Sequence, residues 1–67
     1  MATVKRNGSF AEFWIHDACV WQVSLSKINT HQDLANEIHQ LAEDFEWFHG
    51  DVVREFETFG EQHLNRY

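Results

Sequence analysis

One apolar stripe dominates the second half of this 67-residue chain. Its members recur every three or four residues, and the mean interval is close to the 3.6 residues of an α-helical turn. The pattern therefore predicts helix with one side buried against a core. The stripe consists of Leu34, Ile38, Leu41, Phe45, Phe48, Val52, Phe56, Phe59 and His63.

The ends of this helical region are marked by polar residues and a glycine. Thr30 stands three residues before an aspartate, which is the spacing of a capping box. Gly50 followed by Asp51 is typical of one helix ending and another beginning. An unbroken helix would span roughly 54 Å, whereas a seven-residue strand is about 23 Å long. We therefore predict a first helix at residues 30–49 and a second at 51–66.

The first half has the pattern of a β-meander over residues 1–28. Asn7-Gly8 favours a two-residue hairpin loop, which would pair Arg6 with Ser9 and Val4 with Ala11. A second turn at residues 16–18 leads into a strand at 19–26, where inward and outward side chains alternate. A helix over residues 9–22 is the rival interpretation, because Ser9 and Glu12 also form a capping box.

These elements predict one domain, residues 1–67, of the α+β class. A three-stranded antiparallel meander precedes two helices that pack on one sheet face. The alternative is a mostly α fold with a long C-terminal helix, which requires another chain to cover it.

The strand alternation assigns side chains to the two sheet faces. The inward set is Val4, Phe13, Ile15, Cys19, Trp21, Val23 and Leu25. Phe10, Trp14 and Val20 then point away from the helices, and exposed aromatics grouped in this way often mark a contact site. A register shift of one residue would turn them inward instead.

Composition limits the compartment and the means of stabilisation. A single cysteine, Cys19, excludes an intramolecular disulfide and favours a reducing compartment. Three Trp and six Phe supply large apolar areas for the core instead. We see neither a signal peptide nor an apolar run of membrane-spanning length. The expected location is therefore the cytoplasm.

Charge is distributed unevenly along the chain. Residues 31–67 hold nine carboxylates against two arginines, and the whole chain has a net charge of −6. Such a surface repels nucleic acid and attracts basic proteins. Five carboxylates lie within about 40° of one another beside the apolar stripe: Asp33, Glu37, Asp44, Asp51 and Glu55. They disfavour self-pairing along this seam. A solvated helix shoulder is the simpler interpretation of these five carboxylates, and a docking surface is the functional alternative.

The sequence offers little support for catalysis or metal binding. Glu46 and His49 have the spacing of half a di-iron site, but a second half is missing. The lone cysteine and the serines lack the context of a nucleophile, and the three glycines form no phosphate-binding loop. We therefore expect no enzyme activity, cofactor or metal.

The most specific expectation is a small acidic inhibitor or adaptor, similar in size and charge to accessory proteins of phages and mobile elements. It would dock its carboxylates on a basic, nucleic-acid-handling protein as a nucleic-acid mimic, without binding nucleic acid or membrane. Trp47, Trp14 and Phe10 are the candidate aromatic anchors. The alternative function is a homodimeric assembly module.

Overall fold

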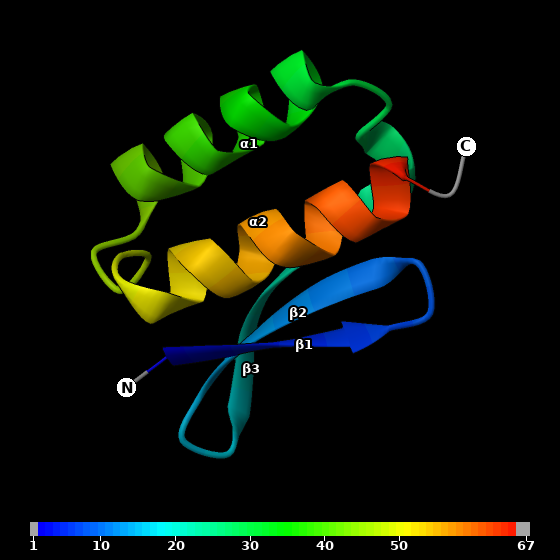
Figure 1. The fold of residues 1–67 in the computed structure, drawn as a ribbon. Helices are drawn as coiled ribbons and strands as arrows, with labels where there is room; N and C mark the ends of the chain where they lie inside the picture. The colour runs from blue at the N-terminus through cyan, green and yellow to red at the C-terminus, as the bar shows by residue number, and fades with distance from the viewer. Residues whose placement is uncertain (1, 66–67) are drawn as a thin grey trace.

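The computed structural model describes residues 2–65 as a sheet covered on one side by a helical hairpin (Figure 1). Three antiparallel strands lie in the order β1-β2-β3, α2 packs against β1, and α1 packs against α2. This confirms the α+β class and the meander, and it excludes a helix over residues 9–22. The elements are β1 (Ala2–Asn7), β2 (Phe10–Ile15), β3 (Ala18–Ser24), a 3₁₀ turn η1 (Leu25–Lys27), α1 (His31–Asp44) and α2 (Asp51–Leu64).

The first hairpin turns one residue later than predicted. Asn7 pairs with Phe10 and Val4 with Phe13, so the two-residue loop is Gly8-Ser9 rather than Asn7-Gly8. Gly8 has a φ of 63°, and Ser9 is not among the residues with positive φ. A loop with glycine at its first central position requires only that one positive φ. The predicted pairing was wrong. Each residue still keeps its predicted face, because the partner of Val4 changes by two residues, from Ala11 to Phe13, and side chains two residues apart share a face.

The second hairpin contains an irregularity that changes one face assignment. Phe13 pairs with Trp21 and Trp14 with Cys19, so Val20 is the extra residue of a β-bulge in β3. The bulge interrupts the alternation, and Cys19 therefore shares the outer face with Trp14. The prediction that Cys19 packs inward was wrong, since its side chain is exposed. The strand also ends at Ser24, and the buried Leu25 begins η1.

The two helices are separate, as predicted, but the first is shorter. The Thr30 hydroxyl oxygen caps α1 by accepting a hydrogen bond from the backbone N–H of Asp33 at 3.1 Å. The helix ends at Asp44, five residues before the predicted end. Residues 45–50 leave the helix and bring three aromatic side chains towards the sheet. Gly50 then turns the chain into α2, with φ of 64° and ψ of −130°.

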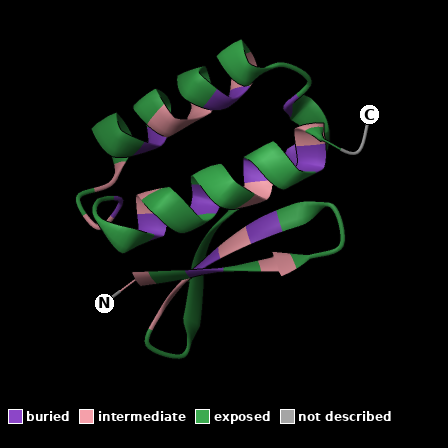
Figure 2. Cartoon of the chain, viewed as in Figure 1, coloured by how far each residue is buried: buried purple, intermediate pink, exposed green. Residues whose placement is uncertain are grey.

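The core lies between the inner sheet face and the facing sides of the two helices, where Figure 2 shows the buried residues. Phe13 is fully buried at its centre, with ring centroids 5.3–5.7 Å from those of Trp47, Phe48 and Phe56. Every member of the apolar stripe is buried or packed against this core, and His63 is 9% exposed. The stripe is therefore confirmed as the core-facing side of both helices.

Candidate protein-binding surface

The helical hairpin, residues 31–64, is the acidic side of the molecule. It carries nine carboxylates and one Lys or Arg, which is Arg54. Among residues 2–65, one ion pair is present, in which His39 Nε2 lies 3.1 Å from Glu43 Oε1. The remaining cations of the described chain, Lys5, Arg6 and Lys27, belong to β1 and η1. The excess of negative charge therefore lies in the helical layer, whereas the strands and the turns between them carry charges of both signs.

The five predicted carboxylates are divided into two groups by the break at Gly50. On α1, the periodicity places Asp33, Glu37 and Asp44 on the flank opposite Ala35. Ala35 lines the groove towards α2. The three carboxylates of α1 therefore point away from the other helix.

The same reasoning applies to α2. Asp51 and Glu55 lie on the flank opposite Gly60, and Gly60 faces Leu34 of α1. Glu55 also lines a hollow with Val4 of β1. The two predicted groups thus lie on opposite outer sides of the hairpin and do not form one continuous line.

Asp33 also has a structural role. Its carboxylate accepts a hydrogen bond from the backbone N–H of Asn29 at 3.1 Å, while its own backbone N–H is bound by Thr30. These bonds satisfy N–H groups at the start of α1 that have no partner inside the helix. A change at Asp33 would therefore affect folding as well as any docking surface.

A groove between the two helices offers a concave surface, whereas the five predicted carboxylates lie on the outer flanks of the hairpin. It encloses about 250 Å³ and is lined on the α2 side by Glu57 and Glu61. On the α1 side its lining includes Leu34, Ala35 and Ile38. The sequence interpretation missed this pair of glutamates. Their four-residue spacing was visible, but the flank of α2 that meets α1 depends on tertiary packing.

The three predicted aromatic anchors lie in different environments. Trp47 is half-buried in the core cluster, where its ring stacks on Phe45 at a centroid distance of 4.8 Å. Trp14 is half-buried on the outer sheet face, and Lys5 Nζ lies 5.1 Å from its ring centroid. Phe10, on the same face, is 39% exposed. The structure therefore places Trp14 and Phe10 together but away from the acidic hairpin and from Trp47.

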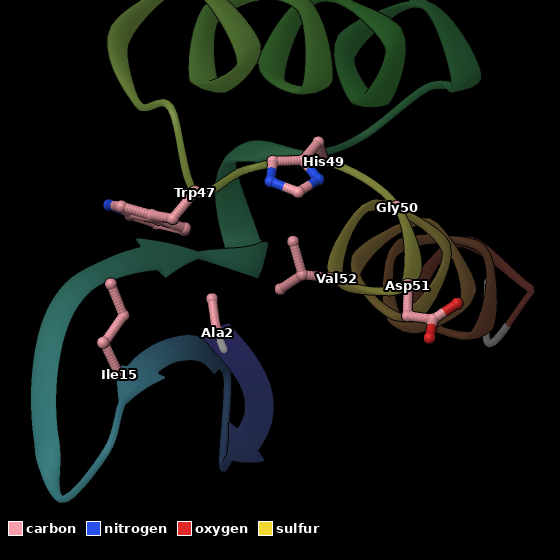
Figure 3. A pocket seen from close by; sticks show the side chains of 7 residues that line it. All are labelled: Ala2, Ile15, Trp47, His49, Gly50, Asp51 and Val52. Carbon is pink, nitrogen blue, oxygen red and sulfur yellow. The ribbon is translucent and has the colours of Figure 1, made fainter.

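A hollow of about 520 Å³ lies beside the loop that joins the helices (Figure 3). His49 directs its imidazole into the space between Trp47 and Val52, whereas the Asp51 carboxylate points away from it (Figure 3). A catalytic pocket requires convergent polar groups, such as a nucleophile beside a base. This lining supplies apolar contact and one imidazole, so it presents no such arrangement.

The predicted half-site of Glu46 and His49 lies in the loop rather than on a helix, so the two residues no longer share a helix face. Across the described residues 2–65, no group of three His, Cys, Asp or Glu side chains is placed to hold a metal ion. Neither helix in that range is long and apolar enough to cross a bilayer. Comparison with family models, curated proteins and solved structures yields no match, and the acidic hairpin is therefore interpreted from its own geometry.

Proposed function

We propose that this protein is a small inhibitor or adaptor whose acidic hairpin docks on the basic surface of a nucleic-acid-handling protein in the cytoplasm. The observation that carries this proposal is the excess of nine carboxylates over one arginine in the helical hairpin. Carboxylates with few intramolecular partners leave a negative field on one side of the molecule. A basic protein surface is the complementary partner, because nucleic-acid sites gather Lys and Arg.

The groove between the helices is the part of this surface best shaped for one basic side chain. Glu57 and Glu61 lie one turn apart, about 6 Å along the helix axis. Ala35 and Ile38 supply an apolar wall across from them. An arginine or lysine can lay its alkyl stem on apolar surface while its charged head meets carboxylates. We therefore assign the groove as the central contact and the outer carboxylates as the long-range attraction.

The test compares two variants with equal net charge. Glu57→Gln/Glu61→Gln neutralises the groove, and Asp44→Asn/Glu55→Gln neutralises one carboxylate on each outer flank. The wild-type protein is used to capture partners from host extract, and each captured protein is then titrated with both variants. We expect the groove variant to weaken binding at least tenfold more than the flank variant, since buried charge pairs contribute more than peripheral ones.

A second arm tests the class of partner. Duplex DNA or RNA added to the complex should displace the acidic protein, because both would occupy the same basic surface. The proposal is overturned if the captured protein binds the groove variant as tightly as wild type at low salt. It is equally overturned if saturating nucleic acid leaves the complex intact.

A further inference from the structure

Within residues 2–65, the outer face of the sheet carries no helix, since both helices lie on its other side (Figure 1). The strand registers place on it two aromatic side chains, Phe10 and Trp14, together with polar side chains and one ion of each sign. Lys5 and Glu12 are those ions, and they are direct cross-strand partners. This face is therefore close to neutral, in contrast to the hairpin.

The two sheet edges are protected from strand-to-strand pairing. The bulge at Val20 interrupts the ladder of β3, and β1 carries Lys5 and Arg6. Bulges and edge cations are two devices that prevent another strand from adding to a sheet. The face lacks such protection, and it is the sheet surface still available for a specific contact.

Charge decides which partner the face fits. The nine carboxylates of the hairpin repel a second copy that approaches from the helix side. The outer face has no such excess of negative charge. A two-fold rotation can place its lysine opposite the glutamate of a second copy, and its glutamate opposite the lysine of that copy. An axis parallel to the strands, between β1 and β2, brings Lys5 of one copy opposite Glu12 of the other. The same rotation sets Phe10 against Asn7 and Trp14 against Thr3.

We propose that a second copy of this chain packs on the outer sheet face through this two-fold arrangement. The two sheets would then lie face to face, in the aligned packing common to β-sandwiches. The helical hairpins would lie outermost on opposite sides, so each dimer would present two acidic surfaces. Self-association stands apart from the proposed function, because it concerns the opposite side of the molecule.

The size of the face sets the expected affinity. Strands of six residues are about 20 Å long and lie about 4.8 Å apart. With the axis between β1 and β2, these two strands of each copy face each other, and their contact is smaller than the roughly 800 Å² per partner of a standard interface. We therefore expect reversible dimers with a dissociation constant on the order of micromolar or weaker.

Sedimentation equilibrium over protein concentrations from about 1 μM to about 1 mM tests the arrangement. Lys5→Glu places two acids opposite each other, and Glu12→Lys places two lysines opposite each other, so each variant should dimerise at least tenfold more weakly than wild type. The double variant Lys5→Glu/Glu12→Lys should recover dimerisation. An equal mixture of the two single variants should form heterodimers. Circular dichroism confirms that each variant is folded.

Glu57→Gln is the matched control, because it alters charge on the hairpin and should leave dimerisation intact. A wild-type protein that remains monomeric at about 1 mM overturns the proposal. So does a folded Lys5→Glu variant that dimerises as strongly as wild type.

Discussion

At the scale of single residues, Gly60 is a place where α2 packs closely against α1. A Cβ placed there would overlap with Leu34 Cδ1 and would lie 3.0 Å from Leu34 Cδ2 and 3.2 Å from its Cγ. Leu34 is 4% exposed, and its side chain would have to shift to admit that Cβ. Glycine ordinarily weakens a helix interior by about 1 kcal/mol relative to alanine. At Gly60 this cost is offset by the close packing that it allows.

Gly60→Ala therefore has two opposing effects on the free energy of unfolding. The gain in helix propensity is about 1 kcal/mol, and overpacking a core costs about 1–3 kcal/mol. We expect a net destabilisation of about 1 kcal/mol in urea unfolding. In a Leu34→Val background, which removes both Cδ atoms, the same change should become neutral or stabilising. If Gly60→Ala has the same effect in both backgrounds, the contact with Leu34 is not what disfavours a side chain at position 60.

Single residues also mark where sequence reasoning succeeded and where it stopped. His63 was predicted to be partly buried because it continues the apolar stripe, and the structure confirms this. Cys19 was misassigned because a bulge inserts one residue into an otherwise regular alternation. Gly60 could not be recognised at all, since its role depends on which flank of α2 meets α1. Periodicity identifies a buried side, but it does not identify the neighbour.

At the scale of elements, the break between the helices depends on the backbone conformation of Gly50. Its φ of 64° with ψ of −130° lies in a region that residues with a Cβ avoid. Before this turn, Trp47 and Phe48 pack against Phe13, and Phe45 stacks on Trp47. The position of the break was predictable from Gly50-Asp51. The early end of α1 was not, because the aromatics that end it also fit the helical stripe.

Gly50→Ala should destabilise the fold by about 1–3 kcal/mol, the usual range for a residue held in a disfavoured conformation. His49→Ala is the control, because His49 is exposed and has no positive φ. Its effect should stay within about 0.5 kcal/mol. Thermal unfolding followed by circular dichroism measures both. A rise in helical signal for Gly50→Ala would instead indicate that the two helices can merge into one.

The start of α1 depends on Thr30 in a similarly local way. Removal of the hydroxyl in Thr30→Ala leaves the Asp33 N–H without its acceptor and should cost about 1 kcal/mol. Thr30→Ser keeps the acceptor and should retain most of the stability. Thr58, whose hydroxyl bonds the carbonyl of Arg54 within α2, provides the comparison. Thr58→Ala should be close to neutral in urea unfolding, and equal losses at both threonines would contradict the cap.

At the scale of the whole molecule, the acidic layer follows from the order of the elements. The chain places nine of its eleven acidic residues in the second half, and the fold turns that half into one layer. The acidic character of the surface was therefore predictable. The arrangement of its carboxylates was not, because a helix wheel drawn through Gly50 joins two groups that the hairpin sets on opposite sides. The groove of Glu57 and Glu61 needs the tertiary structure.

This charged layer should make stability depend on salt. The molecule measures 33 × 24 × 17 Å, and the Debye length falls from about 30 Å at 0.01 M salt to about 10 Å at 0.1 M. At low salt, each carboxylate of the hairpin therefore experiences repulsion from nearly all the others. Screening removes most of this repulsion, and we expect the Tm to rise by several degrees between about 0.01 M and about 0.2 M NaCl.

The triple variant Glu46→Gln/Glu57→Gln/Glu61→Gln identifies the source of that dependence. All three side chains are exposed and belong to the hairpin, so their neutralisation should raise the Tm at low salt and flatten its rise with NaCl. Scanning calorimetry of the wild type and the triple variant at the same protein concentration measures both Tm values. A wild-type Tm that does not change with NaCl would mean that the carboxylates are too well solvated to repel. The same field would then be too weak to guide a basic partner to the hairpin.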